Sequence, residues 1–192
     1  MNFFAALAVL SSSFYFVIGI LTFSKDPRQR ANLLFLLLSA FTGTWSFGLY
    51  LFFMAETAEK ARQIVILFSG VVFACPPLFL HFYLVLTGIL CRFSKKLVPL
   101  FYLPFAIIAA ATYAGHGFIG SVYPIYIKSV FVSWSVEYGK GSLLFWLFTV
   151  ASLLEVLGCV CMLISWHRNS PAKRGKRQAR VIMLTLFPSI IL

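Results

Sequence analysis

The sequence predicts an all-α polytopic membrane helix bundle, and three observations lead to this fold class. Of the 192 residues, 61% are hydrophobic and 11% are charged, whereas soluble domains carry roughly 45–50% apolar and about 25% charged residues. The mean hydropathy is +0.94. Apolar runs long enough to cross a hydrocarbon layer of ~30 Å recur along the chain. Together these features exclude a soluble enzyme, a disordered chain and a disulfide scaffold.

Five of the apolar runs are predicted to be complete spans, because each ends at a polar or basic segment. The first ends before a Lys-Asp-Pro-Arg turn, the second before the polar stretch 55–63, and the third before Arg-Phe-Ser-Lys-Lys. Pro76 and Pro77 interrupt the third run, since a proline deprives a helix carbonyl of its partner. That interruption is either a signalling hinge or static bundle geometry. The predicted spans are residues 3–23, 31–54, 64–90, 97–113 and 143–165, with an incomplete sixth at 181–192.

The incomplete sixth span indicates that the natural chain continues beyond these residues. Its twelve apolar residues are too few to cross a bilayer, which takes about 20. The whole sequence is therefore interpreted as a single transmembrane sensor or anchor region, with any cytoplasmic output domain absent.

Basic residues favour one side of the predicted bundle. Loops after spans one, three and five carry twelve Lys and Arg residues, and loops after spans two and four carry four. By the positive-inside rule, the first set is cytoplasmic and the N-terminus lies outside. The basic run 168–180 is interpreted as a topology determinant that can also meet anionic headgroups, not as a nucleic-acid site. The first set is Lys25, Arg28, Arg30, Arg92, Lys95, Lys96, Arg168, Lys173, Arg174, Lys176, Arg177 and Arg180, and the second is Lys60, Arg62, Lys128 and Lys140.

The longest predicted external loop covers residues 114–141. Within it, residues 123–138 are rich in β-branched and aromatic side chains that partly alternate, which favours a short external β-hairpin on the outer face of the bundle. The alternative is an aromatic segment that dips into the membrane interface. If the hairpin forms, Tyr126 and Trp134 are candidate ligand contacts.

Two ionisable side chains lie inside predicted spans, where charge is costly unless it faces a partner or a cavity. His81 lies nine residues before the end of span three and Glu155 lies ten before the end of span five, so both are expected at a similar depth. Small residues share the helix face of Glu155, namely Ser152, Gly158 and Cys159, which favours a face turned toward other helices. We predict that both ionisable side chains point into the bundle and pair directly or through a water, with Thr42 as the alternative partner. A packing role and a role in proton or ligand sensing both remain open.

The sequence carries no motif for catalysis, cofactor binding or metal binding. The four cysteines, Cys75, Cys91, Cys159 and Cys161, lie within or at the inner ends of spans and are interpreted as small buried hydrophobic residues. No activity, cofactor or metal is expected in this segment. The competing function classes are a small permease that uses Glu155 and His81 as a proton relay, and a membrane-embedded transferase. Both need more polar groups than the spans and loops offer.

Landmarks in the spans and loops point to one family. A tryptophan lies in the second span within FTGTWSFGLYLFF, and the third span contains FSGVVFACPPLFLHFYLVLTG. Glu-Tyr-Gly-Lys-Gly precedes span five, and Arg-Gln-Ala-Arg leads into a last run that bears a proline. The landmark residues are Trp45, Pro76, Pro77, Phe79, Phe82 and Pro188. In these features the chain resembles the N-terminal seven-helix membrane region of bacterial sensor histidine kinases.

The resemblance implies a signal-sensing and anchoring region in the bilayer of the bacterial inner membrane. It implies a homodimer, a cytoplasmic kinase module in the same chain, and a response regulator that receives the phosphoryl group from that module. None of the kinase motifs lies in these residues, and His116 and His167 lack the context of a phospho-accepting histidine. The same membrane region is also similar to those coupled to diguanylate cyclases, which is the alternative output.

Overall fold

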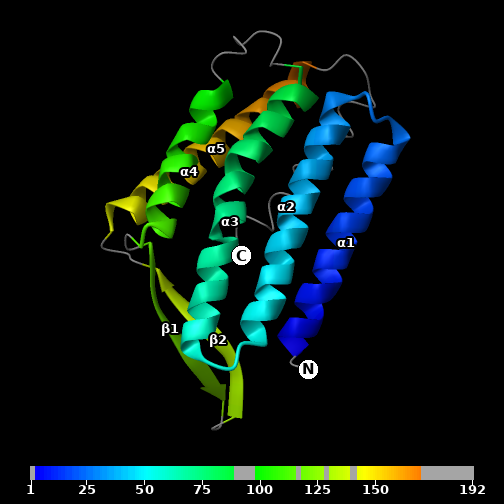
Figure 1. Cartoon of the computed structure of the whole chain (residues 1–192). Coiled ribbons are helices and arrows are strands. Elements are labelled where there is room, and N and C mark those ends of the chain that lie inside the picture. The colour runs from blue at the N-terminus through cyan, green and yellow to red at the C-terminus, as the bar shows by residue number, and fades with distance from the viewer. Residues whose placement is uncertain (1–2, 89–97, 116–117, 128–129, 139–141, 170–192) are drawn as a thin grey trace.

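A computed structural model of the chain describes residues 3–88, 98–115, 118–127, 130–138 and 142–169. This part of the chain is mostly helical, as predicted, and Figure 1 shows its helices side by side with a two-stranded antiparallel sheet at one end. Four of the helices are long and apolar enough to cross a membrane, and α4 is shorter. The elements are α1 (Phe3–Lys25), α2 (Arg30–Phe53), α3 (Ala58–Leu86), α4 (Val98–Tyr113), β1 (Ile119–Ile127), β2 (Val130–Tyr138) and α5 (Leu143–Asn169).

Helices α1 and α2 pack closely because small residues meet where they cross. A Cβ atom added to Gly19 of α1 would lie 2.8 Å from the Cβ atom of Ser39 on α2, nearer than two such carbons can approach. Both residues are buried. Small residues at helix crossings let backbones approach closely, which is how helices gain packing energy in a membrane.

Helix α3 differs from the predicted third span at both ends. It begins at Ala58 rather than at residue 64, because Thr57 caps it: the Thr57 hydroxyl accepts from the Lys60 backbone N–H at 3.2 Å. It ends at Leu86 rather than at residue 90, and Gly88 follows with a φ of 72°, a conformation that favours glycine. The helix continues through Pro76 and Pro77, so the prolines do not divide it.

A surface ion pair accompanies the start of α3. Lys60 Nζ lies 2.6 Å from Glu56 Oε2, and both side chains are exposed. The hydrogen bond and the charge of Lys60 hold the pKa of Glu56 below its ordinary value. Exposed pairs of this kind contribute little stability, but the pair places compensating charges at this turn.

Some predicted spans differ in length from the helices, and other predicted features lie outside the described residues. All five predicted spans contain a helix, and four of these helices are long enough to cross a membrane. The fifth, α4, has 16 described residues, which rise about 24 Å, less than the ~30 Å of a hydrocarbon core. Helix α5 extends four residues beyond the predicted end of span five, to Asn169. The parts outside the described residues are the sixth span at 181–192, Pro188, Cys91, His116, and the basic residues Arg92, Lys95, Lys96, Lys128, Lys140, Lys173, Arg174, Lys176, Arg177 and Arg180.

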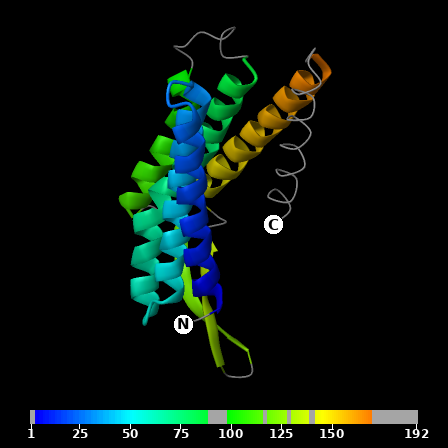
Figure 2. The same ribbon diagram turned by 90° about the vertical axis from the view of Figure 1, so that its right-hand side faces the viewer.

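The described charges separate between the two ends of the bundle. Figures 1 and 2 show the start of α1, the α2–α3 turn and the strands at one end, and the α1–α2 turn with the ends of α3 and α5 at the other. The second end carries Lys25, Arg28, Arg30 and Arg168 with Asp26, and the strand end carries Lys60 and Arg62 with Glu56, Glu59 and Glu137.

The two strands lie in the segment from which the sequence predicts a hairpin. They pair antiparallel, with Ile119 opposite Tyr138 and Pro124 opposite Trp134. Strand β1 begins four residues before the expected start at position 123. The indole N–H of Trp134 donates to the backbone oxygen of Ala55 at 3.0 Å, which fastens β2 to the α2–α3 turn.

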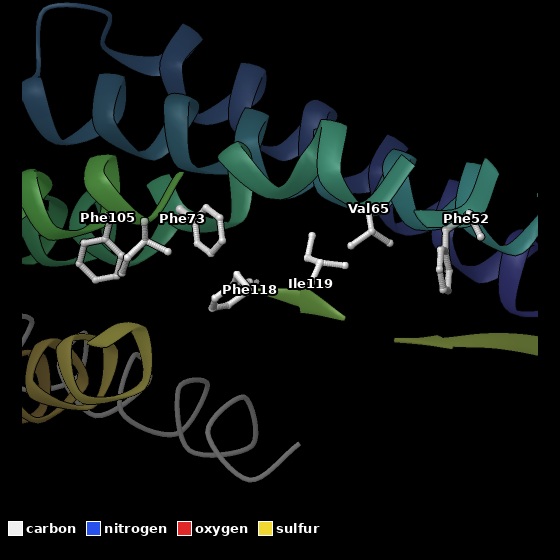
Figure 3. Packing of buried hydrophobic residues seen from close by; sticks show 8 residues of the cluster. Phe52, Val65, Phe73, Phe105, Phe118 and Ile119 are labelled. Carbon is white, nitrogen blue, oxygen red and sulfur yellow. The ribbon is translucent and has the colours of Figure 1, made fainter. Parts of the chain in front are cut away.

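The main core lies where α3, α4, α5 and the start of β1 converge. Phe73, Phe105, Phe118 and Ile108 are buried there (Figure 3). The ring of Phe118 lies 4.9 Å from that of Phe73 and 5.5 Å from that of Phe148, both edge-on. Edge-to-face aromatic pairs contribute about 0.5–1.5 kcal/mol beyond the area that they bury. This cluster therefore joins the strands to α3 and α5.

Candidate functional site

A cavity of about 300 Å³ lies between α3 and α5. The residues of α3 that line it recur every three or four positions, and so do those of α5, so each helix contributes one face. Ser152, Glu155 and Cys159 share the α5 face, in agreement with the small-residue face expected around Glu155. The lining residues are Val72, Cys75, Pro76, Phe79 and Tyr83 of α3, and Phe148, Ser152, Glu155, Val156, Cys159 and Val160 of α5.

A second hollow, of about 500 Å³, lies among α3, α4 and α5. Helix α4 contributes Leu100, Phe101, Pro104 and Phe105 to its wall. Glu155 is the one residue that lines both spaces. Its carboxylate thus lies at the boundary between the two spaces that flank the contact of α3 with α5.

Glu155 is the chemically distinctive group of this site. Its Oε2 atom and the Oγ atom of Ser152 are buried and have no hydrogen-bond partner among the described residues. Burying a carboxylate costs free energy unless a partner compensates it, and an ionisable group inside a membrane span marks a functional site by default. Both residues line the cavity, so this part of the bundle holds two polar groups that no described residue satisfies.

His81 does not pair directly with Glu155 in the described part of the chain, so the direct form of the predicted pair is wrong, and pairing through a water stays a prediction. Its Nδ1 atom lies 3.1 Å from the hydroxyl oxygen of Tyr102 on α4, and the two rings meet edge-on. A similar depth does not determine which face of α3 each neighbour occupies: His81 faces α4, whereas the α3 face toward α5 holds Phe79 and Tyr83. Thr42, the alternative partner, donates to the backbone oxygen of Leu38 at 2.9 Å.

The two strand residues predicted to contact a ligand, Tyr126 and Trp134, lie on different strands. Trp134 is half-buried and its N–H serves the Ala55 carbonyl, which favours a packing role. The backbone of Tyr126 lies in β1 opposite Phe131. A ligand contact by these two residues stays a prediction.

The remaining landmark residues of the third span pack against neighbouring helices. The ring of Phe82 lies 5.9 Å from that of Phe35 on α2, and Pro77 is buried. Trp45 is half-buried on α2. Of the cysteines, Cys159 is buried, Cys75 is partly exposed and Cys161 is exposed, so the expectation of burial is wrong for Cys161.

Sequence reasoning missed the tyrosines that tie α4 to α3. The Tyr113 hydroxyl donates to the Leu67 backbone oxygen at 3.0 Å and accepts from the Gly70 N–H at 3.2 Å. Tyr102 and Tyr113 are eleven residues apart, which is about three helical turns, so both lie on one face of α4. That spacing is the sequence pattern from which this pair of contacts to α3 could have been predicted. Within the described part of the chain, no group of three or more His, Cys, Asp or Glu side chains is placed to hold a metal ion.

Comparison with known proteins gives one match. A family model described as the N-terminal 7TM region of histidine kinase matches residues 7–192. No curated protein and no solved structure matches the chain. The matched range begins inside α1 and includes every other helix and strand described above.

Proposed function

The chain belongs to the family of N-terminal 7TM regions of histidine kinases, and on this basis we propose that it is the membrane-embedded sensing and anchoring region of a two-component sensor kinase. The observation that carries the proposal is the family match over residues 7–192. The four long apolar helices agree with a membrane location. The cytoplasmic kinase module follows in the same chain, and a response regulator receives its phosphoryl group. The protein acts as a homodimer in the bacterial inner membrane.

The orientation that we propose places the N-terminus and the strands outside the cell. Lys25, Arg28, Arg30 and Arg168 lie at the opposite end of the bundle from the strands, and basic residues favour the cytoplasmic side. In this orientation α5 runs inward and is followed by the basic run 170–180. External events then reach the kinase through α5 and the segments after it.

The signalling step that we propose is a displacement of α5 against α3. Figure 2 shows α5 leaning away from the other helices along its second half. Its outer face exposes large apolar side chains, among them Leu147, Leu153 and Leu157. A helix that packs along one side breaks fewer contacts when it shifts than a helix that is buried on all sides. Glu155 lies at the contact that such a shift would change.

The test of this function is autophosphorylation of the full-length protein in native membranes. We expect ATP to transfer its γ-phosphoryl group to a histidine of the cytoplasmic module, which gives an acid-labile, alkali-stable label. A variant with that histidine changed to glutamine is the control and should stay unlabelled. A coding sequence that ends after one more span, or a label that is stable to acid, would contradict the proposal.

A further inference from the structure

We propose that the cavity between α3 and α5 binds a small lipophilic amine, with the ammonium group on Glu155 and the hydrocarbon body against the apolar wall. The inference rests on the proposed sensing function in one respect, namely that this amine is the stimulus. Binding itself can be measured without any kinase output. Three features of the cavity support the proposal: its size, its apolar lining residues and its polar atoms without a described hydrogen-bond partner.

The size of the cavity limits the ligand. At about 300 Å³, the cavity lies at the lower end of the range for small-molecule sites, which is roughly 300–1,000 Å³. A water molecule occupies about 30 Å³ of liquid, so the space suits a compound of about ten non-hydrogen atoms. A lipid or a peptide helix is too large to be contained in it.

The residues that line the cavity favour a ligand with an apolar hydrocarbon part. Val72 and Phe79 of α3 face Phe148, Val156 and Val160 of α5 across the space. Removing apolar ligand surface from water releases about 25 cal/mol for each Å². Aromatic rings also attract a cation over their faces, so Phe79 and Phe148 tolerate an ammonium group better than aliphatic residues would.

The polar groups of the cavity call for hydrogen-bond donors. Glu155 and Ser152 each have a buried oxygen atom without a hydrogen-bond partner in the described residues. Pro76 has no N–H, so the carbonyl of Val72, four residues earlier, lacks its usual helical donor, and both residues line the cavity. The site thus combines a carboxylate, a hydroxyl and a carbonyl.

An ammonium group matches this set better than the alternatives do. It carries a positive charge and three N–H donors, as the lysine side chain does. An alcohol offers one donor and no charge, and a carboxylate ligand would be repelled by Glu155. Among the described residues, neither Lys nor Arg lines either hollow, so no described residue of these walls neutralises Glu155.

Two native cysteines provide a probe and a matched control for the test. Cys159 is buried and lines the cavity, whereas Cys161, two residues further along α5, is exposed. The full-length protein in phosphatidylcholine nanodiscs is treated with N-ethylmaleimide, and modification is followed by mass spectrometry. With Cys75 and Cys91 also changed to serine, the Cys161→Ser variant reports on Cys159, and the Cys159→Ser variant reports on Cys161.

The ligand probes are 2-phenylethylamine and its neutral analogue 2-phenylethanol, which match in size. We expect the amine to slow modification of Cys159 at least fivefold and to leave Cys161 unchanged. The alcohol should protect Cys159 much less. Glu155→Gln should abolish the difference between the two compounds, and Glu155→Asp, which keeps the charge, should retain most of it. Ser152→Ala should weaken protection by the amine, and an unchanged circular dichroism spectrum shows that a variant is folded.

Several results would overturn the inference. They are equal protection by amine and alcohol, protection of both cysteines, no protection, and a Cys159 that is unreactive before any ligand is added. The last result would mean that the cavity does not admit a small molecule. If histidine autophosphorylation is intact while binding fails, the ligand assignment falls and the sensor-kinase function stands.

Discussion

The partner of His81 shows how a single hydroxyl group changes the interpretation of a membrane site. Tyr102 of α4 supplies the hydrogen bond that the sequence assigned to Glu155. The carboxylate is left with a buried oxygen atom that no described residue serves. In the described part of the chain no direct hydrogen bond joins His81 to Glu155, although Tyr102, the partner of His81, also interacts electrostatically with Glu155.

A double-mutant cycle separates these two interactions. His81→Ala and Tyr102→Phe should show a coupling free energy of about 0.5–1.5 kcal/mol, since each change removes the same hydrogen bond. His81→Ala and Glu155→Gln should add without coupling. Unfolding of the protein by a denaturing detergent measures both cycles. Coupling in the second cycle that equals the first would show that His81 and Glu155 act as one unit.

The crossing of α1 and α2 depends on the absence of a side chain at Gly19. In Gly19→Ala the new methyl group would lie 2.8 Å from Ser39 Cβ, and that atom cannot swing away because it is attached to the backbone. We expect the free energy of unfolding to fall by about 1–3 kcal/mol.

Gly158→Ala is the matched control for the change at Gly19. Its added methyl group would lie 3.9 Å from Leu80 Cδ1, an ordinary contact. Because alanine favours helices over glycine, this variant should be neutral or slightly more stable. Equal losses in the two variants, measured in the same unfolding experiment, would mean that the α1–α2 contact is not the cause.

At the level of the elements, the Trp134 side chain helps to fasten the strands to the α2–α3 turn, in addition to the contacts of Phe118 with α3 and α5. Trp134→Phe removes the N–H that serves the Ala55 carbonyl and keeps most of the ring. Hydrogen exchange of the β1 and β2 amides should become roughly five- to tenfold faster, because the lost bond contributes about 1 kcal/mol. Trp146→Phe, at a residue of α5 that is 56% exposed, is the control. Unchanged hydrogen exchange in Trp134→Phe would show that this hydrogen bond does not stabilise the strands.

The sequence predicted the helices well and their ends less well. Apolar runs located all five described helices, because hydrophobic length is the dominant signal in a membrane chain. The start of α3 was missed because residues 58–63, four of which are polar, extend the helix beyond its apolar run, and only the Thr57 cap marks that start. The β-branched and aromatic content of residues 123–138 located the strands.

Contacts between elements were the part that the sequence could not supply. Periodicity gives the face of a helix but not its neighbour, so the faces of His81 and Glu155 were assigned without knowing that α4 packs against α3. Ser152 and Cys159 were correctly grouped with Glu155, because residues on the same helix need no tertiary information. The Phe73–Phe118 contact joins residues 45 positions apart, and no local pattern indicates it.

For the whole molecule, the distribution of charge predicts the topology. A reporter fused after Arg92 or Lys173 should behave as cytoplasmic, and one fused near Gly120 as external, because basic loops stay inside. A fusion within the α2–α3 turn, near Glu56, is a second external site and serves as the control. Alkaline phosphatase and green fluorescent protein fusions measure the two sides independently. Opposite behaviour at two of these positions would overturn the orientation, and with it the proposed direction of signalling.

The position of Phe118 has a mechanical consequence for the molecule. The residue lies directly before β1, and its ring contacts Phe73 of α3 and Phe148 of α5, which also contact each other. Phe148 is also part of the cavity wall, one turn from Ser152. A change in the position of the strands therefore reaches the contact between α3 and α5 through a single ring, and we expect it to alter the packing beside Glu155.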